Sequence, residues 1–420
     1  MKSLYFLFCI TLFISGYNQL NAQCGNGRYH DAIFSTPTTP VTVTYGNAMK
    51  YDSTYQDLMV DLYMPTGDNL AHRPLLLFAF GGNFTAGIRQ SPDLVILCTY
   101  FAQRGYVCAS IDYRLGYNGG STDSNQFMAL MRATQDMKAA VRFFYKDAGT
   151  TNTYRIDTNQ IFIGGVSAGA FAALNYAYLK QDTLSKPQPS FAIPVVIGLG
   201  GPDGNSGNPG YSQKVKGVID LCGGIADTVW IMPGDPMMVG VHGTNDNNVA
   251  CYYDSVVALG NSQSRLFGGG DIKNRLSHIT MIDSFYLFQG AHHVPFIIPY
   301  APSYNPAPWM DSTEWIIRDF LFQNITCDPT TISNVEEVNG DISVSVFPNP
   351  SNDAVSIYSH QDNELQARFV TLTGQLLQQG LLSGNSVLTL AKKDYSEGVY
   401  LLQISDKKGA LLKTERIVFY

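Results

Sequence analysis

The sequence predicts an α/β protein with a mostly parallel sheet flanked by helices, followed by a small all-β domain. Up to about Cys327, short apolar runs alternate with helical stretches. The runs are continuous, which is typical of strands that are buried on both faces. From Asp328 onward, short alternating segments separated by turn residues replace this pattern. A chain of 420 residues, 45% of them hydrophobic, is long enough for one large and one small domain.

The elements follow from these patterns. The predicted sheet strands are Leu75–Phe80, Tyr106–Ile111, Ile161–Ile163, Val239–Val241 and Phe285–Phe288. The predicted helices are Asp93–Arg104, Gln126–Phe144, Ala168–Lys180 and Thr313–Phe322. Val41–Tyr45 and Met59–Tyr63 alternate and are predicted as antiparallel edge strands. The Gly-rich stretches Gly198–Gly210 and Leu266–Arg275 are predicted surface insertions, either walls of a substrate cleft or ordinary loops.

The N-terminus is typical of a signal peptide over residues 1–22. Lys2 supplies the positive charge, and the apolar run Leu4–Ile14 is too short to span a bilayer. Cleavage after Ala22 is expected; a buried N-terminal strand is the alternative. Cys24 lacks the small preceding residue of a lipobox, which favours soluble export. No later stretch is long and apolar enough for a transmembrane segment.

Charge and cysteines exclude several classes of protein. The net charge of −7 and the lack of a long Lys/Arg run argue against nucleic-acid binding. No zinc spacing occurs, so neither metal nor cofactor is expected. Six cysteines remain after removal of the signal peptide and permit disulfides in 15 possible pairings. They are Cys24, Cys98, Cys108, Cys222, Cys251 and Cys327. Cys98 and Cys108 fit buried free thiols equally well.

The predicted domains are therefore an α/β catalytic domain over 23–327, a polar linker over 328–340 and a β-sandwich over 341–420. Turn signals recur through the last region at about the spacing of short sandwich strands. It contains no pattern of catalytic residues.

A candidate nucleophile lies in the pentapeptide Gly165–Gly169, which matches Gly-x-Ser-x-Gly with Ser167 at its centre. A strand-like run precedes it and a helix start follows it. Such a turn exposes the serine in a strained conformation, and glycines two residues before and after avoid collisions. The alternative is a Gly-rich strand–helix turn with a capping serine.

Backbone N–H groups for an oxyanion hole are expected from two places. Gly81 and Gly82 directly follow an apolar strand, so a ligand oxygen could approach their backbone. Ala168 follows the serine at a helix N-terminus, where free N–H groups favour negative charge. A plain tight turn is the other interpretation of the glycine pair.

The order Ser, Asp, His points to the remaining partners. Asp246 follows an apolar strand, and we prefer it to Asp254 and Asp235 as the acid. Either His292 or His293 fits the order as the base. An adjacent histidine pair could suggest metal, but no partner ligands stand at helical spacing. His242 is expected to lie beside the acid.

Residues 60–322 resemble the carboxylesterase branch of the α/β-hydrolase superfamily, close to bacterial esterases of the carboxylesterase/feruloyl-esterase type. The resemblance rests on Phe80–Phe84, Ser110–Leu115, Asp136–Phe144, Gly165–Gly169, His242–Asp246 and Gly290–Pro295. It implies that His293 is the base, by alignment on Val294-Pro295. The chain departs from the family where Phe80 replaces His, Asn83 replaces the third Gly of the oxyanion loop, and His292 replaces a Gly.

The C-terminal region is similar to the type A sorting domain of the type IX secretion system of Bacteroidetes. Three segments carry the similarity: Val346–Pro350, Leu372–Gln375 and Glu397–Tyr400. The resemblance implies export across both membranes to the cell surface or exterior, contact with the secretion machinery, and removal of the tail.

Together these features predict a secreted carboxylic ester hydrolase with the triad Ser167, Asp246 and His293 and an acyl-enzyme intermediate. The substrate is a small-molecule or polymer-borne ester, with aryl, acetyl-sugar, feruloyl and polyester substrates all open. A serine peptidase of the prolyl-oligopeptidase type is the enzymatic alternative, although the chain has no room for an N-terminal propeller. A catalytically silent adhesion module is the alternative from another class.

Overall fold

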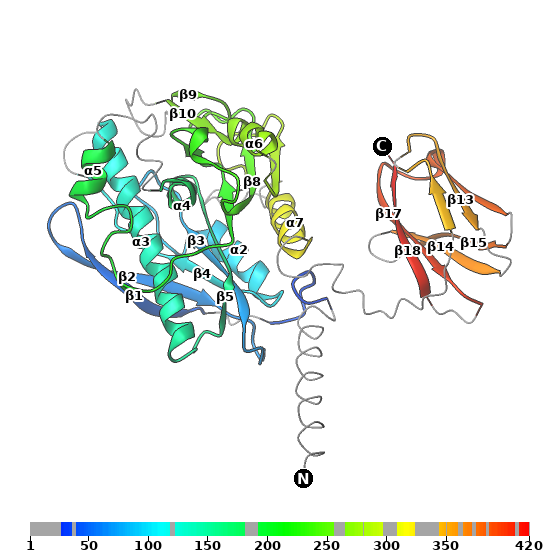
Figure 1. Cartoon of the computed structure of the whole chain (residues 1–420), viewed down its shortest axis with the longest axis horizontal. Coiled ribbons are helices and arrows are strands. Elements are labelled where there is room, and N and C mark those ends of the chain that lie inside the picture. Colours follow the sequence, from blue (N-terminus) through cyan, green and yellow to red (C-terminus); the bar gives the residue numbers. More distant parts are fainter. Residues whose placement is uncertain are drawn as a thin grey trace, which may run out of the picture. The chain divides into compact units, whose positions relative to one another are not determined.

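The chain divides into two compact units, Met1–Pro329 and Thr330–Tyr420. The computed structural model (Figure 1) describes residues 27–35, 39–117, 122–180, 192–255, 265–279, 281–296, 309–323, 344–349, 351–359, 364–371, 375–383, 386–407 and 411–419. The predicted signal peptide and the predicted linker over 328–340 lie outside these residues, as do Cys24 and Cys327.

The first unit is built on one sheet of eight strands in the order β1-β2-β4-β3-β5-β6-β8-β11. The strands are β1 (Val41–Met49), β2 (Tyr55–Tyr63), β3 (Arg73–Ala79), β4 (Val107–Ile111), β5 (Ile156–Val166), β6 (Gly217–Leu221), β8 (Met237–Gly243) and β11 (Asp283–Phe288). From β4 to β11 all neighbours are parallel, whereas β1 and β2 add antiparallel pairs. The predicted fold class is confirmed. The prediction of β2 as an edge strand is wrong, because β2 lies between β1 and β4.

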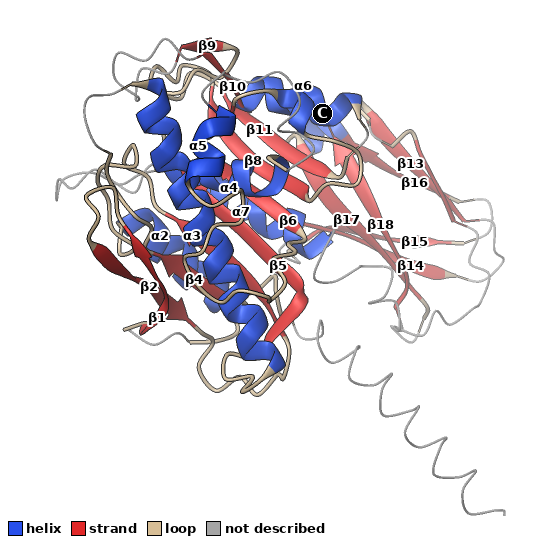
Figure 2. Cartoon of the chain, turned by 60° about the vertical axis from the view of Figure 1, so that its left-hand side comes forward, coloured by secondary structure: helices blue, strands red, loops and turns tan. Residues whose placement is uncertain are grey.

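Helices cover both faces of this sheet (Figure 2). They are α2 (Pro92–Ala102), α3 (Asp123–Gly149), α4 (Ala168–Tyr178), α5 (Ala192–Gly198), α6 (Gly269–His278) and α7 (Met310–Leu321). The crossover through α2 runs from β3 outward to β4, and that through α3 runs back past β3 to β5. Because both crossovers are right-handed, α2 and α3 lie on opposite faces. Helix α4 packs beside α3, and α7 packs beside α2.

The apolar runs of the sequence form the core of the unit. Leu75, Leu76, Leu77 and Phe78 of β3 are all fully buried, as expected for a central parallel strand. Helix α4 is buried along its whole length, and its small residues let it approach the sheet closely. All four predicted helices and all five predicted strands are present, with bounds that shift by a few residues.

One predicted insertion is regular structure. The stretch Leu266–Arg275 forms the end of strand β10 (Arg265–Gly268) and most of α6. Strand β10 pairs with β7 (Gly224–Ile225) and β9 (Asp254–Ser255) in a small separate sheet. The sequence Gly268-Gly269-Gly270 suggests a loop, but its glycines allow close packing against neighbouring segments. A Cβ on Gly268, for example, would collide with the carbonyl oxygen of Ala250. The prediction of an insertion here is wrong.

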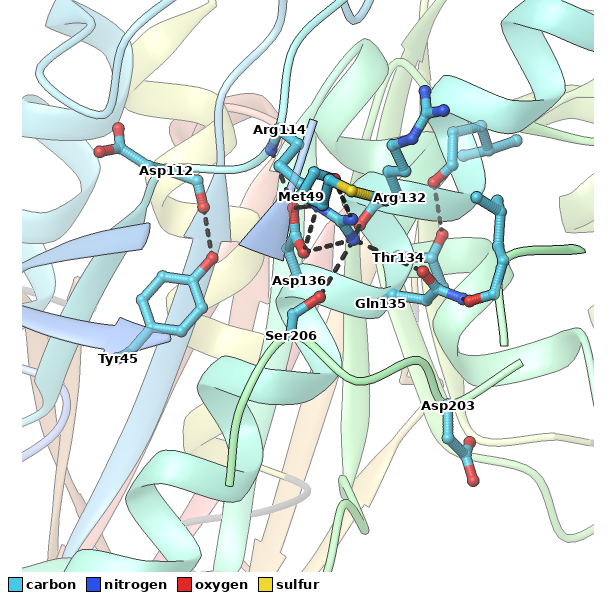
Figure 3. Close-up of polar contacts among 12 residues, drawn as sticks. Tyr45, Met49, Asp112, Arg114, Arg132, Thr134, Gln135, Asp136, Asp203 and Ser206 are labelled. Carbon is cyan, nitrogen blue, oxygen red and sulfur yellow. Dashed lines mark hydrogen bonds and ion pairs between the residues drawn. The ribbon is translucent and has the colours of Figure 1, made fainter. Parts of the chain in front are cut away.

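The other predicted insertion, Gly198–Gly210, is tied to α3 and β1. Gln135 donates to the carbonyl oxygens of Leu199 (3.0 Å) and Gly201 (2.7 Å). Arg114 donates to Ser206 Oγ (3.0 Å) and pairs with the fully buried Asp136 (2.8 Å; Figure 3). These bonds hold the loop against the side of α3. They do not lead to the residues predicted for catalysis.

The second unit is all antiparallel. Sheet β12-β13-β16 and sheet β15-β14-β17-β18 enclose one apolar core, which includes Val355, Phe369 and Leu402. The strands are β12 (Val344–Phe347), β13 (Ala354–Ser359), β14 (Leu365–Thr371), β15 (Leu376–Leu382), β16 (Val387–Ala391), β17 (Gly398–Ser405) and β18 (Leu411–Phe419). The predicted small all-β sandwich is confirmed.

Candidate active site

Ser167 stands on the turn between β5 and α4. Its backbone has φ 52° and ψ −114°, a conformation that residues other than glycine rarely adopt. The turn is held by two bonds: the Ser167 N–H donates to the carbonyl oxygen of Leu221 (2.9 Å), and Phe171 N–H donates to that of Ser167 (3.0 Å). The structure therefore presents this serine on a strained and firmly held turn.

Two hydrogen bonds connect Ser167 with the predicted base and acid. His293 Nε2 lies 2.8 Å from Ser167 Oγ, and His293 Nδ1 lies 2.7 Å from Asp246 Oδ2. The Asp246 carboxylate is completely buried, whereas the His293 ring is 14% exposed. The imidazole thus bridges a hydroxyl and a buried carboxylate, which is the arrangement needed to activate the hydroxyl.

The other residues considered from the sequence lie elsewhere. His292 is exposed, and its Nδ1 lies 3.0 Å from the carbonyl oxygen of Asn245. Asp254 pairs with Arg265 at 3.6 Å, and Asp235 pairs with Lys180. Of the candidates for acid and base, the structure brings only Asp246 and His293 to Ser167.

The loops that carry the acid and the base are joined to each other. Asn245 N–H donates to the carbonyl oxygen of Ala291 (2.9 Å), and Gly290 N–H donates to Thr244 Oγ1 (2.8 Å). In addition, Asp246 Oδ1 accepts the N–H groups of Asn248 and Val249, both at 2.9 Å. The carboxylate is fixed by its own loop while its second oxygen faces His293.

The electrostatics keep Asp246 ionised. Burial opposes the charged form, but hydrogen bonds from His242 and His293 outweigh it and hold the pKa of Asp246 well below its usual value. At the other side of Ser167, the N-terminus of α4 supplies a positive dipole end, and Ala168 is its first residue. The surroundings therefore favour negative charge at the acid and beside the serine.

The glycine pair after β3 lies directly against the serine. A Cβ on Gly81 would come within 3.3 Å of Ser167 Cβ and 3.1 Å of the carbonyl oxygen of Val166, so a side chain there would crowd the serine. The next three residues have positive φ: Gly82 at 126°, Asn83 at 56° and Phe84 at 58°. Positive φ favours glycine, yet Asn83 and Phe84 adopt it here, so the loop turns sharply directly after β3.

Tyr113 supports this loop and was not identified from the sequence. Its hydroxyl donates to the carbonyl oxygen of Phe80 (2.9 Å), and its ring stacks on that of Phe80 with centroids 4.3 Å apart. The Gly116 N–H donates to the carbonyl oxygen of Phe84 (2.7 Å). Phe80 thus has a stacking partner at the start of the loop. No sequence pattern predicts the contact of Tyr113 with Phe80, because these residues follow two different strands, β4 and β3.

His242 and Asp220 are the other polar residues near the acid. Both are fully buried, on neighbouring strands β8 and β6. His242 follows from its sequence position beside Asp246, whereas Asp220 sits inside a strand and gives no signal. Among the described residues, no group of three or more His, Cys, Asp or Glu side chains is arranged to hold a metal ion.

Comparison with known families agrees with this architecture. Residues 60–227 match the family model BD-FAE, and residues 345–419 match the model described as secretion system C-terminal sorting domain. No curated protein matches the chain. In the described part of the chain, no helix has the length and apolar character needed to cross a bilayer.

Similar solved structures include three of esterase 2 from Thermogutta terrifontis. The enzyme phosphorylated by paraoxon has 19% identity and a TM-score of 0.49, covering 68% of this chain and 94% of that chain. The butyrate-bound form has 19% identity and a TM-score of 0.49, covering 70% and 96%. The propionate-bound form has 19% identity and a TM-score of 0.48, covering 68% and 94%.

The two family matches cover the two units separately, and each agrees with the fold of its unit. Residues 60–227 thus match the BD-FAE family model and residues 345–419 match the sorting-domain model, so the chain combines an esterase-like α/β-hydrolase unit with a C-terminal secretion sorting domain.

Proposed function

We propose that the chain hydrolyses carboxylic esters through Ser167, with His293 as general base and Asp246 as the acid that orients it. The observation that carries the proposal is the pair of hydrogen bonds made by His293, 2.8 Å to Ser167 Oγ and 2.7 Å to Asp246 Oδ2. A base must reach both its proton source and its orienting carboxylate, and this imidazole does so.

In the first half of the reaction, Ser167 Oγ bonds to the ester carbonyl carbon and its proton passes to His293 Nε2. The carbonyl oxygen becomes an oxyanion, for which the backbone N–H groups of Ala168 and Gly82 are the proposed donors, with Gly81 giving room for its approach. Collapse of this intermediate breaks the bond to the alcohol oxygen. That oxygen takes the proton from His293, and the acyl group stays on the serine.

In the second half, water attacks the acyl-enzyme and gives its proton to His293 Nε2. Collapse of the second oxyanion returns the proton to Ser167 Oγ and releases the carboxylic acid. Throughout, Asp246 remains ionised and stabilises the imidazolium that forms twice. The low pKa of this carboxyl supports its role as a permanent negative charge.

The decisive test is Ser167→Ala. We expect hydrolysis of p-nitrophenyl acetate to fall about 10⁴-fold or more, and labelling by a fluorophosphonate probe to vanish. Ser277→Ala, an exposed serine on α6, is the matched control and should keep both activities. Full hydrolysis by Ser167→Ala would refute the assignment. Absence of labelling in the folded native chain would favour the adhesion module instead.

The choice between the adjacent histidines has its own test. His293→Gln should lower kcat by about 10³-fold or more, because His293 is the base that lies within hydrogen-bond distance of Ser167 Oγ among the described residues. His292→Gln should have a much smaller effect, since that ring is exposed and bonded to Asn245. A larger loss in His292→Gln than in His293→Gln would reverse the assignment.

We also infer that the type IX secretion machinery recognises the second unit. The match of residues 345–419 to the sorting-domain model supports this. A chain ending before residue 330 should accumulate inside the producing cell with its esterase activity intact. Delivery of that truncated chain to the medium at the native level would contradict the inference.

A further inference from the structure

The carboxylate of Asp246 contacts a second imidazole, that of His242. His242 Nε2 lies 2.9 Å from the carbonyl oxygen of Val249 and 3.3 Å from Asp246 Oδ2. Because a carbonyl oxygen can only accept, Nε2 carries the proton and His242 donates toward both oxygens. Oδ2 of Asp246 therefore lies between two rings, His242 on one side and His293 on the other.

The His242 ring is held tightly in this position. Its side chain is 0% exposed. A Cβ on Gly269, the first residue of α6, would come within 2.8 Å of His242 Nδ1, so the start of the helix packs directly on the ring. Within the described residues, Nδ1 has no hydrogen-bond partner. A buried imidazole that uses only its Nε2 is specialised for the contact with the acid loop.

Asp220 is the nearest charged residue on the neighbouring strand. It pairs in register with Gly240 of β8, and residues 240 and 242 point to the same face of the sheet. A Cβ on Gly240 would stand 2.6 Å from the ring of Phe285, so this ring packs directly on Gly240. Asp220 Oδ1 accepts Gly223 N–H (2.8 Å), while Oδ2 has no partner among the described residues.

The charges in this cluster act on one another. Burial raises the pKa of Asp220 to about 6, although the charge of His242 opposes this rise. Burial lowers the pKa of His242, but Asp246, Val249 and Asp220 together outweigh it, so the net direction is upward. Cys222 and Cys251 also interact with Asp246, and burial raises the pKa of both thiols, which keeps them neutral. His242 can therefore become a cation as the pH falls.

A carboxyl and an imidazole buried without full partners cost stability, and apolar residues would fill the same space at less cost. Such groups persist where they serve a site. Here His242 contacts the acid of the triad, and the N-terminus of α6 packs on its ring.

We propose that His242 is a positioning residue for the triad, holding Asp246 toward His293 and competing with His293 for its negative charge, with Asp220 as the counter-ion of His242. This inference rests on the proposed function, because it assigns roles relative to Asp246 and His293. Below neutral pH, cationic His242 draws charge from Asp246. Loss of this cation should therefore shift the acid side of the activity profile to higher pH.

The test compares His242→Gln, which keeps an N–H donor but cannot titrate, with His242→Met, which keeps only the bulk. His278→Gln, an exposed histidine at the other end of α6, is the control. We would measure kcat and KM for p-nitrophenyl acetate from about pH 5 to about pH 9. His242→Met should lose about tenfold or more in kcat with little change in KM, and His242→Gln should recover most of it. In both, the acid-side midpoint should move to higher pH.

The role of Asp220 is tested by following the protonation of the His242 imidazole. In nitrogen-15 NMR of histidine-labelled chain, His242 should carry its proton on Nε2 at high pH. Asp220→Asn should lower the midpoint at which His242 takes up its second proton. An unchanged midpoint would remove Asp220 from the proposal.

Different results would contradict the proposed function and the role of His242. If the native chain neither hydrolyses the ester nor reacts with a fluorophosphonate, the proposed function is wrong. If the native chain does both while His242→Met or His242→Gln keeps the native kcat and pH profile, the role of His242 is wrong. Should His242→Met fail to fold, the pH profile of His242→Gln still decides.

Discussion

Gly165 and Gly169 face each other across the turn that carries Ser167, so closely that a Cβ on Gly165 would stand 2.6 Å from the carbonyl oxygen of Gly169. A Cβ on Gly169 would in turn collide with the carbonyl oxygen of Ala79 at the end of β3. The two glycines thus join three elements: strand β5, helix α4 and the strand that leads into the oxyanion loop. The spacing of the motif follows from backbone contact between these elements.

Gly169→Ala is therefore expected to destabilise the first unit by about 3 kcal/mol or more, because the clash involves rigid backbone. The three tryptophans, Trp230, Trp309 and Trp315, all lie in that unit, so their fluorescence during urea unfolding reports on it alone. The control is Gly149→Ala at the end of α3, where a Cβ meets nothing within 4 Å. It should be neutral or stabilising by up to about 1 kcal/mol. Equal stability of the two variants would contradict the steric account.

Tyr113→Phe should lower kcat by about two- to tenfold with little change in KM. The variant keeps the ring stacked on Phe80 but loses the hydroxyl bond to the Phe80 carbonyl, so the oxyanion loop is held less firmly. Tyr145→Phe removes a hydroxyl that lies 2.9 Å from the carbonyl oxygen of Thr158 and 3.0 Å from that of Lys214, neither of which belongs to the candidate site. Steady-state kinetics on both variants would show whether the effect is specific: a matching loss of kcat in Tyr145→Phe would assign it to general loosening.

Asp220→Asn should change the pH dependence of stability. The pKa of the folded-state carboxyl is raised from 3.8 to about 6, so ionising it costs stability as the pH rises from about 4 to about 6, and the cost remains above that range. The variant cannot ionise. It should exceed the native chain by about 1–3 kcal/mol at pH 8 and converge with it near pH 4. Urea unfolding followed by tryptophan fluorescence at both pH values measures this. A pH-independent difference would show that Asp220 does not titrate as described.

Arg89→Gln should destabilise the first unit by about 2–4 kcal/mol. The guanidinium bridges Asp61 (2.9 Å) and Asp112 (2.6 Å), and Asp61 is only 1% exposed, so its charge would be left buried without this cation. Lys50→Gln removes the exposed pair with Asp52 and should cost at most about 0.5 kcal/mol. If the losses measured by urea unfolding were alike for the two variants, burial would not be the source of the effect.

Much of the fold could be predicted because its strands are buried on both faces. Runs such as Leu75–Phe80 have no polar residue to obscure them, and β3 forms there. Strand β6 could not be predicted in the same way, since Asp220 interrupts its apolar pattern. Helix α6 was hidden by Gly268, Gly269 and Gly270, which indicate a loop in sequence but allow close packing in space.

In the candidate site as well, some residues could be predicted from local sequence patterns and others could not. Ser167 and Asp246 each follow a recognisable strand in a characteristic order, so short local patterns are enough to nominate them, whereas His293 was distinguished from His292 only by the family resemblance. The relation of His242 to Asp220 depends on the register of β6 against β8, and that of Tyr113 to Phe80 on the contact of two strand ends. Register and long-range contacts are set by the packed sheet, which local sequence does not encode.

The glycine-rich loop bound to α3 has a consequence for how such a chain behaves at high local concentration. Strand β1 forms one end of the sheet and would otherwise offer unsatisfied backbone groups to a neighbouring molecule. Ser206 accepts the N–H of Asn47 (3.0 Å), and Asn208 donates to the carbonyl oxygen of Tyr45 (2.8 Å). The loop thereby pairs backbone groups at the middle of β1 and leaves them unavailable for pairing with a strand of another molecule.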